Sequence, residues 1–186
     1  MQTRFNQTKA AHAASVFLRL RGERMSYLKL IKLLYLLDRT ALERWERPVT
    51  GDRYVSMKLG PVLSSVRDLI VWEQPRAESD LWHQLIGNAG NFEVELKQAV
   101  EPDSLSKREA DLIEEIFQKF GRLDRWKLVE YTHTLPEWKE PEQDNSACSL
   151  EYEDILKGVG KTPEEAAEIC REILDLNRVA ELVGCK

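Results

Sequence analysis

The chain has 186 residues, of which 42% are hydrophobic and 32% are charged, and its formal net charge is −5 at pH 7. This length allows a sizeable buried core, and the composition is typical of a globular protein. No apolar run approaches the roughly 20 residues that a transmembrane helix needs, which excludes a membrane-spanning protein. The negative net charge argues against nonspecific nucleic-acid binding.

Charge is distributed unevenly along the chain. Residues 1–58 carry 12 Lys or Arg against 5 Asp or Glu, whereas residues 137–186 carry 6 against 13. This asymmetry is compatible with pairing inside the molecule, with a polar contact between copies, or with steering of a charged partner. Solvated faces explain it equally well, and the sequence leaves the oligomeric state open.

The cysteines and the first residues point to a reducing compartment. Cys148, Cys170 and Cys185 lie far apart and form no CxxC pair, so neither a disulfide framework nor a zinc site is indicated. The first 14 residues lack the apolar segment of a secretory signal. Both features favour a cytoplasmic location.

The first two predicted elements are helices. Residues 9–21 place alanines, a phenylalanine and a leucine at helical spacing, and Gly22 ends this pattern. Ser26 is a suitable N-cap for a second helix over residues 27–45, whose leucines form one wide apolar stripe. We expect this second helix to be the most buried element.

The next segment carries β signals. Residues 53–58 alternate in polarity and predict a short strand. Pro61, after Gly60, suits the first position of a helix over residues 62–72. Two further β segments, 82–86 and 92–96, flank a Gly/Asn turn at 87–91 and predict a hairpin, which needs the 53–58 strand or a helix beside it.

Helical signals return after Pro102. A capping box at Ser106 predicts a helix that Gly121 ends, and Asp124 caps a helix through about His133. The segment 137–149 reads as a linker, followed by helices over 151–157 and 163–182. The predicted fold is mainly α with a small antiparallel β-sheet (α+β). It comprises a compact helical domain, residues 1–140, with an acidic C-terminal helical extension, residues 141–186, packed on it.

One segment resembles a phosphate-binding loop. Residues 158–162, Gly-Val-Gly-Lys-Thr, end like a P-loop, but Ile155 stands where that loop needs its first glycine, and Pro163 follows. A helix end at the glycines, an N-cap at Thr162 and a capping box with Glu165 account for the same residues. We interpret the segment as a helix junction.

The histidines do not form a recognisable site. His12, His83 and His133 are isolated and lack metal-ligand spacing. His133 is interpreted as a structural histidine at a helix end, with a role in a small hydrolase as the alternative. No nucleophile motif is present. We therefore predict no catalytic, cofactor-binding or metal site, and no enzymatic activity.

A series of short motifs follows along the chain in a distinctive order. The first is Leu30-x-Lys32-Leu33-Leu34-Tyr35, followed by a Thr-Gly-Asp turn and by Gly60-Pro61-Val62. Leu105-Ser106, Phe120-Gly121 and Thr132-His133 with Trp138 come next. In their order these motifs resemble the Panacea domain of SocA-like antitoxins, and the tail from Tyr152 to Glu165 is similar to an extension on many members.

The resemblance implies a small cytoplasmic bacterial or phage-associated protein that neutralises a cognate protein toxin by direct binding. Some members of the family are thought to act instead as proteolytic adaptors, which deliver the toxin to a cytosolic protease. A phage-associated interaction module of another kind is a further alternative.

The resemblance also assigns roles to individual residues. The motif positions expected to serve structure are Tyr35, Gly60, Pro61 and His133. Those expected to contact the toxin, because they put polar tips or large rings near the turn and the sheet, are Lys32, Tyr54, Lys58 and Trp138.

Overall fold

The structure, a computed structural model, describes residues 4–71, 80–142 and 146–182. Its helices are α1 (Gln7–Arg21), α2 (Tyr27–Trp45), α3 (Ser64–Val71), α4 (Leu81–Leu85), α5 (Lys107–Phe120), α6 (Arg125–His133), α7 (Tyr152–Gly158) and α8 (Pro163–Leu182). Its strands are β1 (Arg24–Ser26), β2 (Tyr54–Met57), β3 (Gly60–Leu63), β4 (Ile86–Gly90), β5 (Glu93–Leu96) and β6 (Cys148–Leu150). The predicted mainly α fold is confirmed, with two small antiparallel sheets. None of the helices within the described ranges has the length and apolarity to cross a membrane.

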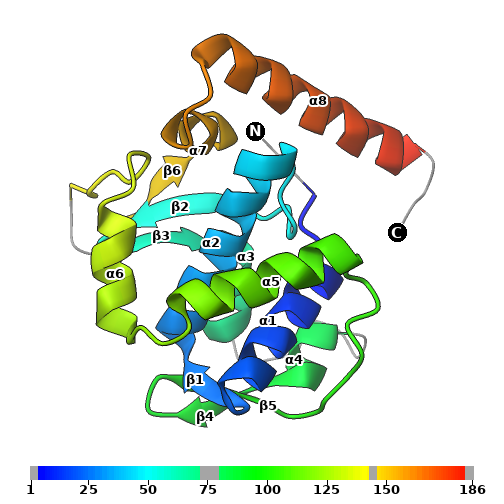
Figure 1. The fold of residues 1–186 in the computed structure, drawn as a ribbon, viewed down its shortest axis with the longest axis vertical. Coiled ribbons are helices and arrows are strands. Elements are labelled where there is room, and N and C mark those ends of the chain that lie inside the picture. The colour runs from blue at the N-terminus through cyan, green and yellow to red at the C-terminus, as the bar shows by residue number, and fades with distance from the viewer. Residues whose placement is uncertain (1–3, 72–79, 143–145, 183–186) are drawn as a thin grey trace.

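Helix α2 is the centre of the fold (Figure 1). Helices α1, α5 and α6 and strand β3 all pack against it, and 12 of its 19 residues are buried. Because neighbours surround it, even two of its lysines are buried. The ammonium of Lys29 donates to the carbonyl oxygens of Gly121 (2.6 Å) and Leu123 (2.7 Å). It thereby places a cation at the carboxyl end of α5, where the helix dipole favours positive charge.

The two sheets are separate and lie at different sides of α2 (Figure 1). One has the strand order β1-β5-β4 and the other β3-β2-β6. The predicted hairpin therefore pairs with β1, an element absent from the sequence prediction, and not with the 53–58 strand. Strand β1 has only three residues, so its own sequence gives no usable alternation.

The hairpin itself is shifted from its predicted position. Residues 81–85 form the short helix α4 instead of a strand, since the side chain of Asp80 caps its first turn. The segment predicted as the turn is mostly strand β4. The turn lies at Asn91 and Phe92, which have φ of 51° and 61°. Two successive left-handed residues are typical of a tight hairpin turn.

The helix predicted to begin at Pro61 begins later. Residues 60–63 form β3, paired with β2, and α3 starts at Ser64. The carboxylate of Asp52 accepts hydrogen bonds from the backbone N–H groups of Ser65 and Val66, both at 3.0 Å. The capping residue lies 12 positions before the first residue of the helix, so the local sequence pattern does not predict it. The predicted last residue of this helix, Trp72, lies outside the described residues.

Two helices begin or end near the predicted residue, but without the predicted capping interaction. Ser26 precedes α2, but its side chain makes no capping bond, and its buried Oγ has no hydrogen-bond partner among the described residues. Gly121 follows α5 with φ of −63°, a right-handed conformation that any residue can adopt. By contrast, the capping box of Ser106 with Glu109 and the Asp124 cap of α6 are confirmed.

The segment predicted as a linker is part of the packed structure where it is described. Ser56 of β2 donates to the carbonyl oxygen of Lys139 at 2.6 Å, and β6 pairs with β2. Beyond it, Tyr152 is buried and donates to the carbonyl oxygen of Asp52 at 3.0 Å. Residues of β6, α7 and α8 belong to the same hydrophobic cluster as α2. The outlying element is α8, which reaches from α7 across one end of the molecule (Figure 1).

Candidate protein-interaction site

Motif residues from four separate parts of the chain meet beneath the turn between β2 and β3. Lys32 comes from α2, Gly60 and Pro61 from β3, His133 from the end of α6, and Trp138 from the segment after it. The ammonium of Lys32 donates to the carbonyl oxygen of Pro61 at 2.8 Å. The sequence resemblance singled out these residues, and the fold brings them together.

Lys32 supports this turn from below. Its side chain has no exposed surface, and the loss of water around it lowers its pKa from 10.5 to about 7. The prediction that Lys32 contacts the toxin assumed an accessible polar tip. In the structure, Lys32 instead joins α2 to β3 inside the protein, so any effect on a partner passes through the turn.

Gly60 lies very close to side chains of two other elements, α2 and α6. Its φ is +91°, and a Cβ built there lies 2.5 Å from Thr132 Oγ1 and 2.9 Å from Lys32 Nζ. Both the backbone conformation and the lack of space therefore require glycine. The structural role assigned to Gly60 by resemblance thus has a physical basis. Thr132, which the sequence analysis left without a role, forms one wall of this site.

His133 and Trp138 form a stacked pair beside the turn. Their ring centroids are 4.0 Å apart at an interplanar angle of 15°, and Trp138 Nε1 donates to the carbonyl oxygen of Met57 at 3.2 Å. Burial and the nearby charge of Lys32 lower the pKa of His133, against the effect of a hydrogen bond with the Lys58 backbone. A neutral imidazole is thereby favoured, which suits flat packing on an indole ring.

The exposed part of this arrangement is small and defined. Lys58 and Leu59 occupy the tip of the turn, where Leu59 is 41% exposed, and Trp138 is half-buried next to the strand that leads to them. We call these three residues the turn face. It presents one cation, one aliphatic side chain and part of one indole. The backbone of the turn is fixed by the hydrogen bond from Lys32 to Pro61 and by the close packing at Gly60.

Tyr54 does not belong to the turn face. It is only 2% exposed, and its hydroxyl donates to Asp38 Oδ2 at 2.9 Å. Asp38 also accepts from the backbone N–H groups of Val49 (2.8 Å) and Thr50 (2.9 Å). Burial raises the pKa of Asp38 to about 6, because desolvation exceeds the effect of these bonds. Tyr54 was predicted to contact the toxin, but the structure places its ring in the core.

A buried ion pair lies next to the site. Arg39 Nε donates to Glu137 Oε1 at 2.6 Å, and the hydroxyl of Tyr35 donates to the same oxygen at 2.8 Å. Arg39 also donates to the carbonyl oxygen of Gly158 at the end of α7. The predicted core position of Tyr35 agrees with this network. Glu137 and Arg39 were missed, because one residue lay in the predicted linker and the other on the polar side of α2.

The other two histidines and the P-loop-like segment have hydrogen-bond partners inside the protein. The ring nitrogen Nδ1 of His12 lies 2.7 Å from Ser104 Oγ, and Nδ1 of His83 lies 2.7 Å from Asp80 Oδ2. In the P-loop-like segment, Thr162 and Glu165 form the expected capping box. Among the described residues, no group of His, Cys, Asp and Glu side chains is arranged to hold a metal ion.

In a comparison with protein-family models, the chain matches the family described as antitoxin SocA-like, Panacea domain. The match spans residues 30–139, which is more than half of the chain. The matched segment begins in α2 and ends just after Trp138. It therefore includes all the motif residues that meet beneath the β2–β3 turn and all three residues of the turn face. Searches of curated proteins and of solved structures found no match. The chain belongs to the family of SocA-like antitoxins with a Panacea domain.

Proposed function

We propose that this chain is an antitoxin that binds a cognate protein toxin in the cytoplasm and neutralises it without turnover. The observation that carries the proposal is the family match over residues 30–139. The convergence of the family's motif residues beneath the β2–β3 turn supports it, since residues far apart in the matched segment together hold one exposed turn.

We further propose that the turn face contacts the toxin. Trp138 is held by the stack on His133 and by its bond to Met57, so little side-chain entropy is lost when it is covered. Half-buried aromatic rings of this kind are frequent anchors in protein interfaces. The ammonium of Lys58 favours a partner surface with negative charge around an apolar depression.

The test uses the product of the gene adjacent to the one that encodes this chain. We expect its expression to arrest growth, co-expression of this protein to restore growth, and the two purified proteins to form a stable complex. Lys58→Glu should weaken the complex by about tenfold or more, which corresponds to ~1.4 kcal/mol. Lys127→Glu, a charge reversal of an exposed lysine on α6, is the matched control.

Two outcomes contradict these proposals separately. An adjacent product that is harmless and does not bind removes the antitoxin assignment for this pair. A complex that is equally weakened by Lys58→Glu and Lys127→Glu, or by neither, keeps the antitoxin assignment and removes the turn face as its binding site. Toxin levels, followed by immunoblot with and without the host's proteases, distinguish neutralisation from the proteolytic-adaptor alternative, in which the toxin disappears.

A further inference from the structure

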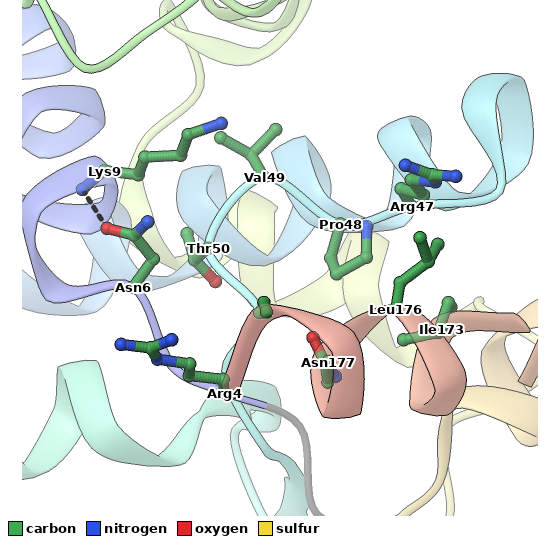
Figure 2. Close-up of a pocket in the computed structure, with 12 residues that line it drawn as sticks. Arg4, Asn6, Lys9, Arg47, Pro48, Val49, Thr50, Ile173, Leu176 and Asn177 are labelled. Atoms are coloured by element: carbon green, nitrogen blue, oxygen red, sulfur yellow. Dashed lines mark hydrogen bonds between the residues drawn. The ribbon is translucent and has the colours of Figure 1, made fainter. Parts of the chain in front are cut away.

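A pocket of about 300 Å³ lies beneath α8, and none of the turn-face residues lines it. Three segments line it: the residues before α1, the loop 47–51 after α2, and the second half of α8 (Figure 2). Its apolar side chains include Pro48, Val49, Ile173 and Leu176. Helix α8 therefore covers this part of the molecule incompletely, in contrast to the closely packed α2.

The polar lining of this pocket has one sign of charge. Its charged residues are Arg4, Lys9 and Arg47, and no Asp or Glu is among its lining residues. Lys9 is already paired with Glu109 at 2.6 Å. Arg47 is exposed and has no ion pair within the described part of the chain. A cation thus stands unpaired at the rim, on a protein whose net charge is negative.

One flank of α8 has the complementary chemistry. Glu172, Leu176 and Val179 are spaced i, i+4 and i+7, so they lie on the same side of the helix. Leu176 is 42% exposed, Val179 is 54% exposed, and Glu172 is exposed without an ion pair among the described residues. Leu176 also lines the pocket together with Arg47 (Figure 2), so the acidic–apolar flank and the basic rim adjoin each other.

We propose that this flank of α8 is the interface of a homodimer, in which two copies are related by a two-fold axis near Leu176. A two-fold contact brings the same patch of each copy together, so the patch must be self-complementary. Here the apolar residues Leu176 and Val179 of one copy meet those of the other. Glu172 of each copy reaches the unpaired Arg47 of its neighbour.

The charges on the patch favour a second copy as the occupant. The flank supplies an acid and the rim supplies a base, so the interaction forms twice, once on each side of the axis. This matches the overall asymmetry, in which residues 1–58 are basic and residues 137–186 are acidic. Two aliphatic residues per copy and two rim ion pairs form a small contact, so the dimer is weak and concentration-dependent.

The test is sedimentation velocity on the purified full chain, from low micromolar to several hundred micromolar protein. We expect a monomer–dimer equilibrium whose dissociation constant rises with salt, because the Arg47–Glu172 pairs are at the rim. Val179→Glu, which does not line the pocket, should raise that constant at least about tenfold. Leu20→Glu is its control, since Leu20 is also an exposed aliphatic residue (41%) and lies on a different helix, α1.

A charge exchange tests the pairing directly. Arg47→Glu and Glu172→Arg should each weaken the dimer, because each places like charges together across the axis. The double variant R47E/E172R should restore it, since both ion pairs re-form with reversed polarity. Arg122→Glu, a reversal at an exposed position between α5 and α6, should leave the equilibrium unchanged.

The proposal is overturned by a chain that remains monomeric over the whole concentration range. It is also overturned by a dimer that Val179→Glu leaves intact, because the contact then lies on another face. A double variant no tighter than either single variant removes the Arg47–Glu172 pairing. Circular dichroism and thermal melting of every variant show whether α8 remains folded, so a lost dimer is not mistaken for a lost helix.

Discussion

At Gly60, strand β3 lies directly against side chains of helices α2 and α6. Strand β3 can pass the ammonium of Lys32 and the hydroxyl of Thr132 only because position 60 has no side chain. The carbonyl oxygen of the next residue, Pro61, then accepts the bond from Lys32. The absence of a Cβ at position 60 thus allows the buried Lys32 side chain to pack directly against the turn.

Gly60→Ala should therefore destabilise the protein strongly. The positive φ alone costs an alanine about 1 kcal/mol, and the collision with Thr132 and Lys32 should bring the total to roughly 3 kcal/mol. Gly160→Ala is the matched control, because Gly160 has a similar φ of +97° but no atom within 4 Å of the point that a Cβ would occupy. Urea denaturation of both variants measures the difference. Equal losses would show that space at position 60 is not limiting.

Lys32 should make stability depend on pH. Burial lowers its pKa from 10.5 to about 7, so between these values the unfolded chain binds a proton that the folded chain does not. The free energy of unfolding therefore rises with pH in this range, by up to ~1.4 kcal/mol per pH unit from this group. Lys32→Met should remove that rise between pH 7 and 9, whereas Lys58→Met, at an exposed lysine, should keep it. Parallel curves for wild type and Lys32→Met would contradict the assignment.

At the scale of elements, the Arg39–Glu137 pair connects three of them. It links α2 to the segment after α6 and, through the carbonyl oxygen of Gly158, to the end of α7. The side chain of Glu137 is fully buried and that of Arg39 is 14% exposed. Removing one charge from such a pair leaves the other buried without its counter-ion.

Glu137→Gln should consequently cost on the order of 3 kcal/mol of unfolding free energy. The Arg44–Glu115 pair offers a matched comparison, because its side chains are 44% and 51% exposed and its geometry is equally close. Glu115→Gln should cost less than about 1 kcal/mol, since water solvates the remaining arginine. Chemical denaturation of both variants measures this contrast. A loss for Glu137→Gln as small as that for Glu115→Gln would show that water compensates Arg39.

Local signals were sufficient for some elements and insufficient for others. Helix α2 was predicted over residues 27–45, because its apolar stripe is long and Pro48 and Gly51 follow it. Helix α3 was misplaced, because its cap is Asp52, distant in sequence. Strand β1 was missed because three residues carry no period, and its pairing depends on a hairpin about 70 residues later. Prediction failed where the stabilising partner was remote.

The candidate site, like the fold, could be predicted from the sequence only in part. Gly60, Pro61, His133 and Trp138 were identified from motif order, and the structure groups them around one turn. The motif order gave no indication that Lys32 and Tyr54 are buried, since the burial of a side chain depends on which helices and strands cover it. The turn face is accordingly smaller than the predicted set, with Lys58 and Trp138 retained and Leu59 added.

At the scale of the whole molecule, the turn face and the α8 flank belong to different parts of the fold. The turn face is supported by α2, α6 and β3 within the family-matched segment, whereas the flank lies on an outlying helix beyond it (Figure 1). Helix α8 contacts mainly α7, so a change on its exposed flank has little structural route to the β2–β3 turn. The two proposed interfaces should therefore function independently.

This independence is testable with one variant on each surface. Val179→Glu should abolish dimerisation in sedimentation velocity and leave toxin neutralisation in the growth assay unchanged. Lys58→Glu should do the reverse, because the turn tip is not part of α8 or of the pocket beneath it. The change in melting temperature should be small for both, since Lys58 and Val179 are exposed. If Val179→Glu also prevents neutralisation in a folded protein, the dimer is the active form and the toxin site extends across both copies.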